Sequence, residues 1–179
     1  MADDPDDALV AAAQADPTRF LALYDRYFPR IHGYVRLRVR DTAACEDVTS
    51  QVFMTALSRI GGFRRGCSFG AWLFRIAQNA VYDVYRARRQ ERIDAATLDM
   101  LPDGEADPEE QALAGERAAR LRALVGTLRP EQQHLLALRY GAGLSMDEIG
   151  RIVDKSAVNV RVSLHRTLHE LRRRYPYDD

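Results

Sequence analysis

Apolar residues recur at helical spacing along most of this chain, and no segment of useful length alternates apolar and polar residues as a strand would. One stripe near the start shows the spacing: Phe20, Leu23, Tyr24, Tyr27, Ile31, Tyr34 and Val35. Residues at these intervals share one face of a helix, where they can be buried against other helices. Pro29 interrupts the stripe and should kink or divide this helix, because its ring removes a backbone donor. The pattern therefore predicts an all-α fold.

An acidic segment divides the helical pattern into two parts. Between Asp94 and Glu116 there are eight acidic residues and no basic one, together with Pro102, Gly104 and Pro108. This composition, without aromatic residues, favours a flexible linker over a third domain. We therefore expect an acidic N-terminal segment at 1–15, a first small helical domain at 16–92, the linker at 93–107 with acidic character to about residue 116, a second small helical domain at 108–175, and a tail at 176–179.

The formal net charge of the 179 residues is zero, but the charges are distributed unevenly. From Arg64 to Arg92 there are seven arginines against two acidic residues, and from Arg151 to Arg174 there are seven basic residues against two acidic ones. Two basic blocks of similar size on helical patterns indicate two surfaces that meet a polyanion. Solvated helix faces would explain either block alone.

Cysteine usage and the N-terminus bear on the compartment. Cys45 and Cys67 lie in different predicted elements and lack metal-ligand spacing, which favours reduced thiols. The first residues, MADDPDD, are acidic where an export or transit signal would be basic, and no apolar run approaches the ~20 residues that span a bilayer. We expect a soluble, cytoplasmic protein without membrane insertion.

The second domain carries the pattern of a helix-turn-helix. Ser145 and Glu148 form an S-x-x-E capping box before a short helix that ends near Val153. Ser156 can cap the longer basic helix that follows a short turn. An ordinary helical hairpin is the alternative interpretation.

A helical wheel separates the two interpretations for this last helix. Its inward stripe lies within about 80° and consists of Ala157, Val160, Leu164, Leu168 and Leu171. The opposite side carries Val158, Asn159, Val162, His165, Arg166, His169 and Arg173. Outward valines have no core to fill, but thymine methyl groups would give them a partner, and Asn or Arg can reach base edges or phosphates. The predicted DNA contacts are Ser156, Val158, Asn159, Arg161, Val162, His165 and Arg166.

His165 and His169 are also four residues apart, which is a spacing of zinc ligands. Arg166 stands where an H-E-x-x-H motif needs glutamate, and the neighbouring arginines would repel a cation. We expect no metal site and no other cofactor.

Aromatic and basic residues are interleaved in the first domain. The glycine-rich turn GGFRRGCSFG contains Phe63, Arg64, Arg65 and Phe69, and Ser68 can cap the helix after it. This helix carries Trp72, Phe74, Arg75, Asn79, Tyr82, Tyr85, Arg86, Arg88 and Arg89, and its core stripe is expected at Leu73, Ile76, Ala77, Ala80, Val84 and Ala87. Single-stranded DNA suits this composition, because bases stack on aromatic rings for ~1–3 kcal/mol each while arginines hold phosphates. The alternative is that Trp72 and Phe74 belong to the core and the arginines are solvated.

Four segments together resemble one known family. They are LYDRYFPRIHGYVRLRV, CEDVTSQVFMTAL and SFGAWLFRIAQNAVYDVYRARR in the first domain, and LRPEQQHLLALRYGAGLSMDEIGRIVDKSAVNVRVSLHRTLHELR in the second. In this order they resemble the two domains of extracytoplasmic-function (group IV) sigma factors of bacterial RNA polymerase. The resemblance covers about residues 16–174.

This resemblance implies an alternative sigma factor, not an enzyme, that binds core RNA polymerase, recognises the −35 and −10 promoter elements and promotes strand opening. The helix at 44–57 would bind the polymerase clamp, with candidates Asp47, Gln51 and Phe53. The glycine-rich turn and the next helix would capture the single-stranded −10 element, with candidates Arg64, Arg65, Phe69, Trp72, Arg75, Asn79 and Arg86. The last helix would enter the major groove of the double-stranded −35 element. An anti-sigma factor is implied as a further partner, although no motif in the chain identifies it.

The chain departs from the family pattern in its clamp-binding helix, at Ser50-Gln51, and in the turn Asp154-Lys155, where glycine is usual.

The runner-up interpretation is a helix-turn-helix transcription regulator whose first domain senses a ligand or a partner. A sensor needs neither the arginine-aromatic helix nor the clamp-binding helix, and a helical metalloenzyme would need a ligand set that the sequence lacks. Complex formation with core RNA polymerase distinguishes these classes.

Overall fold

The computed structural model describes residues 6–39, 41–64, 67–94 and 110–175, and within these ranges it contains helices and turns but no strand. The prediction of an all-α protein is confirmed. In chain order the elements are α1 (Asp7–Ala15), η1 (Pro17–Phe20), α2 (Leu21–Arg36), α3 (Thr42–Arg59), η2 (Ile60–Gly62), α4 (Phe69–Asp94), α5 (Glu110–Gly126), α6 (Pro130–Leu136), the π-helical turn η3 (Ala137–Gly141), α7 (Met146–Val153) and α8 (Ala157–Arg174). Across the described ranges, no helix combines the length and the apolar character needed to cross a membrane.

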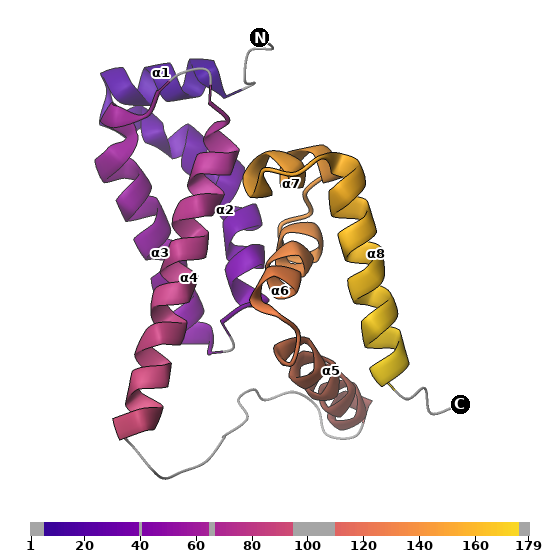
Figure 1. Cartoon of the computed structure of the whole chain (residues 1–179). Coiled ribbons are helices and arrows are strands. Elements are labelled where there is room, and N and C mark those ends of the chain that lie inside the picture. The colour runs from indigo at the N-terminus through magenta and orange to yellow at the C-terminus, as the bar shows by residue number, and fades with distance from the viewer. Residues whose placement is uncertain (1–5, 40, 65–66, 95–109, 176–179) are drawn as a thin grey trace.

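In the first domain, α2, α3 and α4 pack around an apolar core, and α1 lies across one end of them (Figure 1). Asp41 begins α3 by accepting a hydrogen bond from the backbone N–H of Ala44 at 3.3 Å. Ser68 accepts one from the N–H of Ala71 at 3.4 Å, in the capping role that the sequence predicts. Pro29 does not divide α2, which continues through it to Arg36.

The buried face of α4 differs from the expected stripe. Phe74 and Val81 are 1% and 0% exposed, whereas Ala87 is exposed. Phe74 meets Tyr34 of α2 edge-on, with ring centroids 5.7 Å apart. The helix is rotated in this way because α2, α3 and α7 all pack against it, so its apolar face is wider than the predicted one.

In the second domain, α5 to α8 include the predicted helix-turn-helix. The capping box is confirmed, because Ser145 Oγ accepts from the N–H of Glu148 at 3.2 Å and the Ser145 N–H donates to Glu148 Oε2 at 2.8 Å. Ser156 Oγ accepts from the N–H of Asn159 at 3.2 Å and begins α8. Between the two helices, Asp154 adopts the left-handed conformation with φ 54°. Aspartate is among the few residues that tolerate this conformation, so the turn forms without glycine.

The two domains also pack on each other, which the sequence analysis does not predict. Figure 1 shows α2 lying between α3 and α4 on one side and the second domain on the other, and α2 contacts η3 while α4 contacts α7. Gly33 and Gly141 meet backbone to backbone, since a methyl group built on either would overlap the carbonyl oxygen of the other. Arg30 Nη1 lies 2.9 Å from Glu148 Oε1. One apolar cluster therefore continues through both domains.

A buried hydrogen bond crosses this interface. The Tyr34 hydroxyl lies 2.8 Å from His134 Nδ1, and Arg38 Nη1 lies 3.5 Å from the same hydroxyl. Burial raises the pKa of Tyr34, so the hydroxyl stays protonated. Burial, reinforced by the charge of Arg38, lowers the pKa of His134 to about 4. Because a guanidinium only donates, the Tyr34 oxygen accepts from Arg38 and its proton is left for neutral His134.

The packing of the two domains should weaken in mild acid. A solvent-exposed histidine has a pKa of 6.5, so the depressed pKa of His134 leaves the packed form fully stable above pH 6.5 and destabilises it progressively as the pH falls toward 4. A protonated Nδ1 can no longer accept from Tyr34. We expect the urea midpoint of unfolding to fall between pH 7 and pH 5, and to fall less in His134→Gln, whose side-chain carbonyl accepts without titrating. His32→Gln is the control. The role of His134 would be contradicted if the urea midpoint fell equally in the parent and in His134→Gln, or if His32→Gln reduced the fall as much as His134→Gln does.

Candidate nucleic-acid interface

Helix α8 presents the two faces that the helical wheel predicts. Val160 and Leu164 are 0% and 3% exposed, whereas Val158 and Val162 are 65% and 42% exposed. The exposed face also carries Asn159, Arg161, His165 and Arg166. The predicted residue Ser156 is exposed as well, and its side chain is engaged in capping the helix. The inward residues hold α8 against the domain and leave a mixed apolar and basic surface free.

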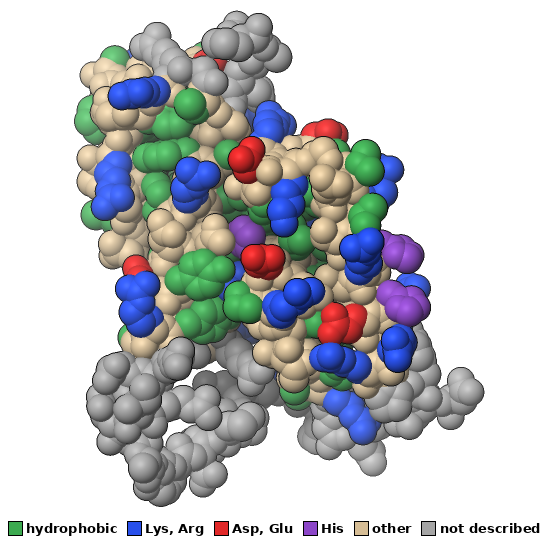
Figure 2. Space-filling model, in the orientation of Figure 1, with side chains coloured by type: hydrophobic (Ala, Val, Ile, Leu, Met, Phe, Trp, Pro, Cys, Tyr) green, Lys and Arg blue, Asp and Glu red, His purple; other side chains and the backbone are tan. Residues whose placement is uncertain are grey.

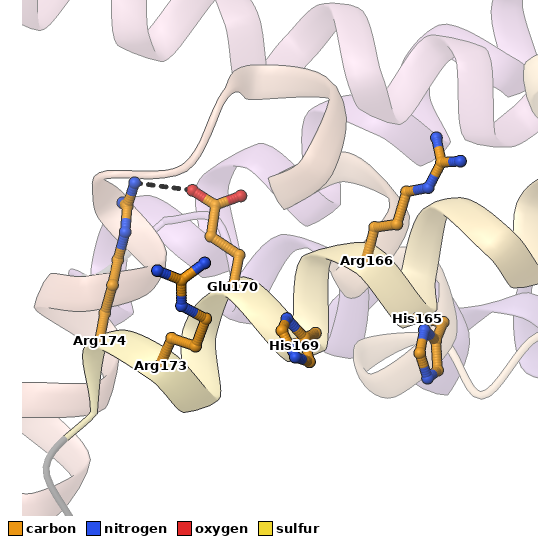
Figure 3. Close-up of a pocket in the computed structure, with 6 residues that line it drawn as sticks. All are labelled: His165, Arg166, His169, Glu170, Arg173 and Arg174. Carbon is orange, nitrogen blue, oxygen red and sulfur yellow. Dashed lines mark ion pairs between the residues drawn. The ribbon is translucent and has the colours of Figure 1, made fainter.

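A basic cavity of about 690 Å³ borders the second half of α8. Its lining consists of His165, Arg166, His169, Glu170, Arg173 and Arg174 (Figure 3). Arg174 Nη2 lies 2.8 Å from Glu170 Oε1, and Glu170 also accepts a hydrogen bond from Gln132 at 2.9 Å. Arg166 extends away from this ion pair toward the start of the helix (Figure 3). The only carboxylate of the lining is thus already engaged with Arg174, which leaves Arg166 and Arg173 to attract an anion.

Two of these lining residues raise the question of a metal site. His165 and His169 occur on the same stretch of α8, among Arg166 and Arg173. Within the part of the chain that the structure describes, no group of three or more His, Cys, Asp or Glu side chains could hold a metal ion. The arginines of the lining, Arg166 and Arg173 among them, give the cavity a basic character that suits an anion.

A second candidate surface follows one face of α4. Trp72, Arg75, Asn79, Tyr82 and Arg86 lie within about 80° of one another on the helix. Arg75, Asn79 and Arg86 are exposed, while Trp72 and Tyr82 are half-buried. Arg86 forms an ion pair of 3.5 Å with Asp83, but both side chains are largely exposed and the pair contributes little. The surface combines two aromatic rings with three polar or basic side chains. Lys and Arg side chains are likewise spread over the visible faces of both domains (Figure 2).

An aromatic cluster supports the N-terminal end of this surface and corrects one predicted contact. Phe69 is 1% exposed and packs against Phe63 and Tyr27, with ring centroids 5.7 and 5.4 Å apart, so it belongs to the core and does not present its ring to DNA. Trp72 packs against Phe63 and Phe69 at 5.1 and 5.5 Å and remains partly accessible. Arg64 is exposed in the preceding turn.

The predicted contact at Arg65 lies outside the described residues. The structure therefore brings Trp72, Arg75 and Asn79 onto one surface, with Arg86 further along the same helix.

Helix α3 carries the predicted polymerase contacts, and one of them needs correction. Asp47 and Gln51 are exposed. Phe53 is only 4% exposed and packs against Tyr24, with ring centroids 4.7 Å apart, so it supports the core and is not available to a partner. Met54 is 64% exposed instead. It lies three residues after Gln51 and seven after Asp47, which places the three side chains on one outward face.

Sequence reasoning also missed two residues that support the α4 surface. Gln14 of α1 donates from Nε2 to the backbone oxygens of Ile60 and Phe63, at 2.9 and 2.8 Å, and so holds the turn before α4. Arg38 is 5% exposed, and its guanidinium lies 5.8 Å from the ring centre of Tyr82 and 5.4 Å from that of Tyr85. Both act on residues about 45 positions away, so no local pattern could identify them.

Two protein-family models match the chain. Sigma-70 region 2 matches residues 23–91, and Sigma-70, region 4 matches residues 124–173. The chain is 37% identical over 174 residues to the ECF RNA polymerase sigma factor BldN of Streptomyces coelicolor, covering 95% of this chain and 66% of that protein. It is 32% identical over 173 residues to the ECF RNA polymerase sigma factor SigD of Mycobacterium tuberculosis, covering 93% of this chain and 82% of that protein.

Solved structures share the fold. CnrH, in its complex with the cytosolic domain of CnrY, superposes with a TM-score of 0.71 at 23% identity and covers 98% of this chain and 100% of that one. The sigma factor RpoE, in complex with the anti-sigma factor NepR from Bartonella quintana, superposes with a TM-score of 0.65 at 18% identity and covers 89% of this chain and 98% of that one. At these identities the likeness concerns the fold alone.

Proposed function

Because the chain belongs to the extracytoplasmic-function sigma factors of RNA polymerase, we propose that it is an alternative sigma factor. In this role it binds core RNA polymerase, recognises the −35 and −10 promoter elements and promotes strand opening. The observation that carries the proposal is the pair of exposed surfaces, one on each domain, that combine basic side chains with apolar or aromatic ones. A sigma factor needs two such surfaces, whereas a regulator with a sensor domain needs only the second.

At the −35 element, α8 would act as the recognition helix in the major groove. Val158 and Val162 would contact thymine methyl groups, and Asn159 near the helix start would reach base edges. Arg161, Arg166 and His165 would contribute phosphate contacts, which fix the register on the duplex and make binding depend on salt. Ser156 would act through its capping bond, which sets the first turn of α8.

At the −10 element, the α4 surface would bind the separated strand. An unpaired base can stack on the accessible part of Trp72 while Arg75 and Arg86 hold phosphates and Asn79 bonds to a base edge. Arg64 in the preceding turn would add a further phosphate contact. Since these interactions form only with unpaired bases, their free energy offsets the cost of melting and shifts the equilibrium toward the open duplex. The function requires no catalytic residue, in keeping with a family of initiation factors rather than enzymes.

The outward face of α3 would bind core RNA polymerase through Asp47, Gln51 and Met54. The exposed thioether of Met54 offers apolar area beside two polar groups, which suits a surface that is buried on association. An anti-sigma factor is a further proposed partner, since the related RpoE was solved with the anti-sigma factor NepR. Such an assembly, like transcription itself, would be cytoplasmic.

The proposal predicts a stable complex with the core RNA polymerase of its host and a promoter-dependent transcript. Met54→Asp should weaken the complex about fivefold, or roughly 1 kcal/mol, because it places a charge in an apolar contact. The measurement is the affinity for core polymerase by fluorescence anisotropy, followed by run-off transcription from a promoter mapped by transcript sequencing.

Leu21→Asp is the matched control, because Leu21 is 63% exposed and comparably apolar but lies on α2. An equal loss in both variants would remove Met54 from the interface. The absence of any complex or transcript with the parent protein would refute the sigma-factor assignment itself.

A further inference from the structure

A buried polar anchor joins the start of α1 to α2 and, beyond it, to α4. Asp6, which precedes α1, is 1% exposed; its carboxylate accepts a hydrogen bond from the Tyr27 hydroxyl and lies 3.0 Å from Arg26 Nη1. The Tyr27 ring packs edge-on against Phe69, with centroids 5.4 Å apart. A methyl group built on Gly70 would lie 2.9 Å from the Tyr27 hydroxyl oxygen. One tyrosine therefore connects the start of α1 with the first turn of α4.

The other end of α1 holds the turn that follows α3. Gln14 donates from Nε2 to the backbone oxygens of Ile60 and Phe63, at 2.9 and 2.8 Å, and these two residues begin and follow η2. A side-chain amide nitrogen carries two hydrogens, so a single side chain fixes both ends of the turn. Val10 and Ala13, which are 0% and 1% exposed, bury the apolar side of α1. Covering the core therefore does not require Gln14.

The turn that Gln14 holds leads directly into the α4 surface. The Phe63 ring is 8% exposed and packs against Trp72 and Phe69, with centroids 5.1 and 5.7 Å apart. The next residue, Arg64, is exposed. The position of Phe63 thus determines where Arg64 leaves the core and which part of the Trp72 ring stays accessible.

We propose that α1 belongs to the strand-binding surface of the first domain: Gln14 is a positioning residue that fixes Phe63 and, through it, holds the Trp72 ring where an unpaired base stacks on it. The inference rests on the proposed function. A ring that is ordered before the base arrives binds more tightly, because no ordering cost is added on association. Gln14 therefore strengthens capture of the −10 strand without touching DNA, while −35 binding by α8 in the other domain does not depend on it.

Gln14→Met tests the proposal, because methionine keeps an unbranched side chain of similar length but has no N–H to donate. Trp72 is the only tryptophan of the chain, so the fluorescence of the free protein reports on its surroundings. We expect acrylamide to quench Trp72 more strongly in Gln14→Met than in the parent. With core polymerase, the affinity for a single-stranded oligonucleotide of the mapped −10 element should fall about fivefold, as for the loss of one weak base stack. The affinity for the mapped −35 duplex should not change.

Gln14→Lys is the second variant, since its ammonium group can donate to both carbonyl oxygens and should restore the quenching and the −10 affinity toward the parent values. The −35 duplex affinity of the same variant shows how much of its DNA binding comes from the added charge. Gln133→Met is the matched control, because Gln133 makes the same kind of bonds in the second domain, from Nε2 to the backbone oxygens of Gly126 and Leu128 at 3.3 and 2.9 Å. It should leave the quenching of Trp72 and the −10 affinity unchanged. Circular dichroism checks that the variants keep the helical content of the parent.

The outcomes separate positioning from general stability. The proposal is overturned if Gln14→Met matches the parent in either the quenching of Trp72 or the affinity for the −10 strand. Equal losses of −10 strand affinity and −35 duplex affinity would show that Gln14 only stabilises the fold, and would overturn it as well. A parent protein that binds no −10 strand in the presence of core polymerase would instead refute the proposed function, and this inference with it.

Discussion

Gly150→Ala should weaken specific binding to a −35 duplex more than tenfold, although Gly150 lies in α7 and contacts no DNA in the proposed complex. Gly150 is buried, and a methyl group on it would lie 2.5 Å from the backbone oxygen of Lys155, in the turn that leads to α8. The turn cannot give way easily, because Asp154 is held at φ 54° and Ser156 caps the next helix. Overpacking of this kind costs about 1–3 kcal/mol and would change the angle between α7 and α8.

Two measurements separate a loss of stability from a change in the orientation of α8. We expect the urea midpoint to fall, and we expect the affinity for the mapped −35 duplex, measured by anisotropy under conditions where the variant is folded, to fall more than tenfold. Gly62→Ala is the matched control, since it adds the same methyl group where nothing lies within 4 Å. An unchanged affinity in a folded Gly150→Ala protein would show that the angle between the two helices does not control recognition.

Replacing Arg75 and Asn79 together with alanine should reduce promoter opening by about a hundredfold, or roughly 2.7 kcal/mol, while leaving the affinity for duplex promoter DNA nearly unchanged. Both side chains are exposed one turn apart on α4, beside the accessible part of Trp72. Neither is needed for the core, so the fold should be retained. Because they would contact only the separated strand, their loss raises the free energy of the open complex and not that of the closed one.

Permanganate reactivity of unpaired thymines reports opening, and anisotropy with duplex promoter reports the closed complex. Arg19→Ala is a suitable control, because Arg19 is an exposed arginine in η1 whose ion pair with Asp16 is long, at 3.8 Å. An equal loss of opening and of duplex affinity would contradict the assignment of Arg75 and Asn79 to the melted strand. A similar loss in Arg19→Ala would mean that total positive charge, and not the α4 surface, drives opening.

Much of the fold and of the α8 surface could be predicted from local sequence. The Ser145–Glu148 capping box and the Ser156 cap depend on residues three positions apart, and both form as expected. The two faces of α8 were also predictable, because a helix with one apolar stripe packs that stripe inward. Val158 and Val162 are therefore exposed for the reason that the helical wheel gives.

Prediction was less successful where aromatic residues lie among arginines. Phe53 was a candidate for contact with polymerase and Phe69 for contact with DNA, and both are buried. Phe74, for which a core position was the alternative, is buried as well. An aromatic ring suits a core as well as a stacked base, and the sequence does not show which neighbours surround it. The sequence analysis did not predict Met54 as a contact, because its exposure depends on how α3 is rotated against α2 and α4.

The sequence by itself determined the helices, their caps, the helix-turn-helix and the family, because each depends on short-range patterns or on ordered motifs. Only the tertiary structure decided that α2 meets η3 through Gly33 and Gly141, and that Tyr34 bonds to His134 a hundred residues away. Hydrogen bonds and close backbone contacts of this kind depend on three-dimensional distance, which no local periodicity encodes. The arrangement of the two domains is for this reason a property of the folded chain.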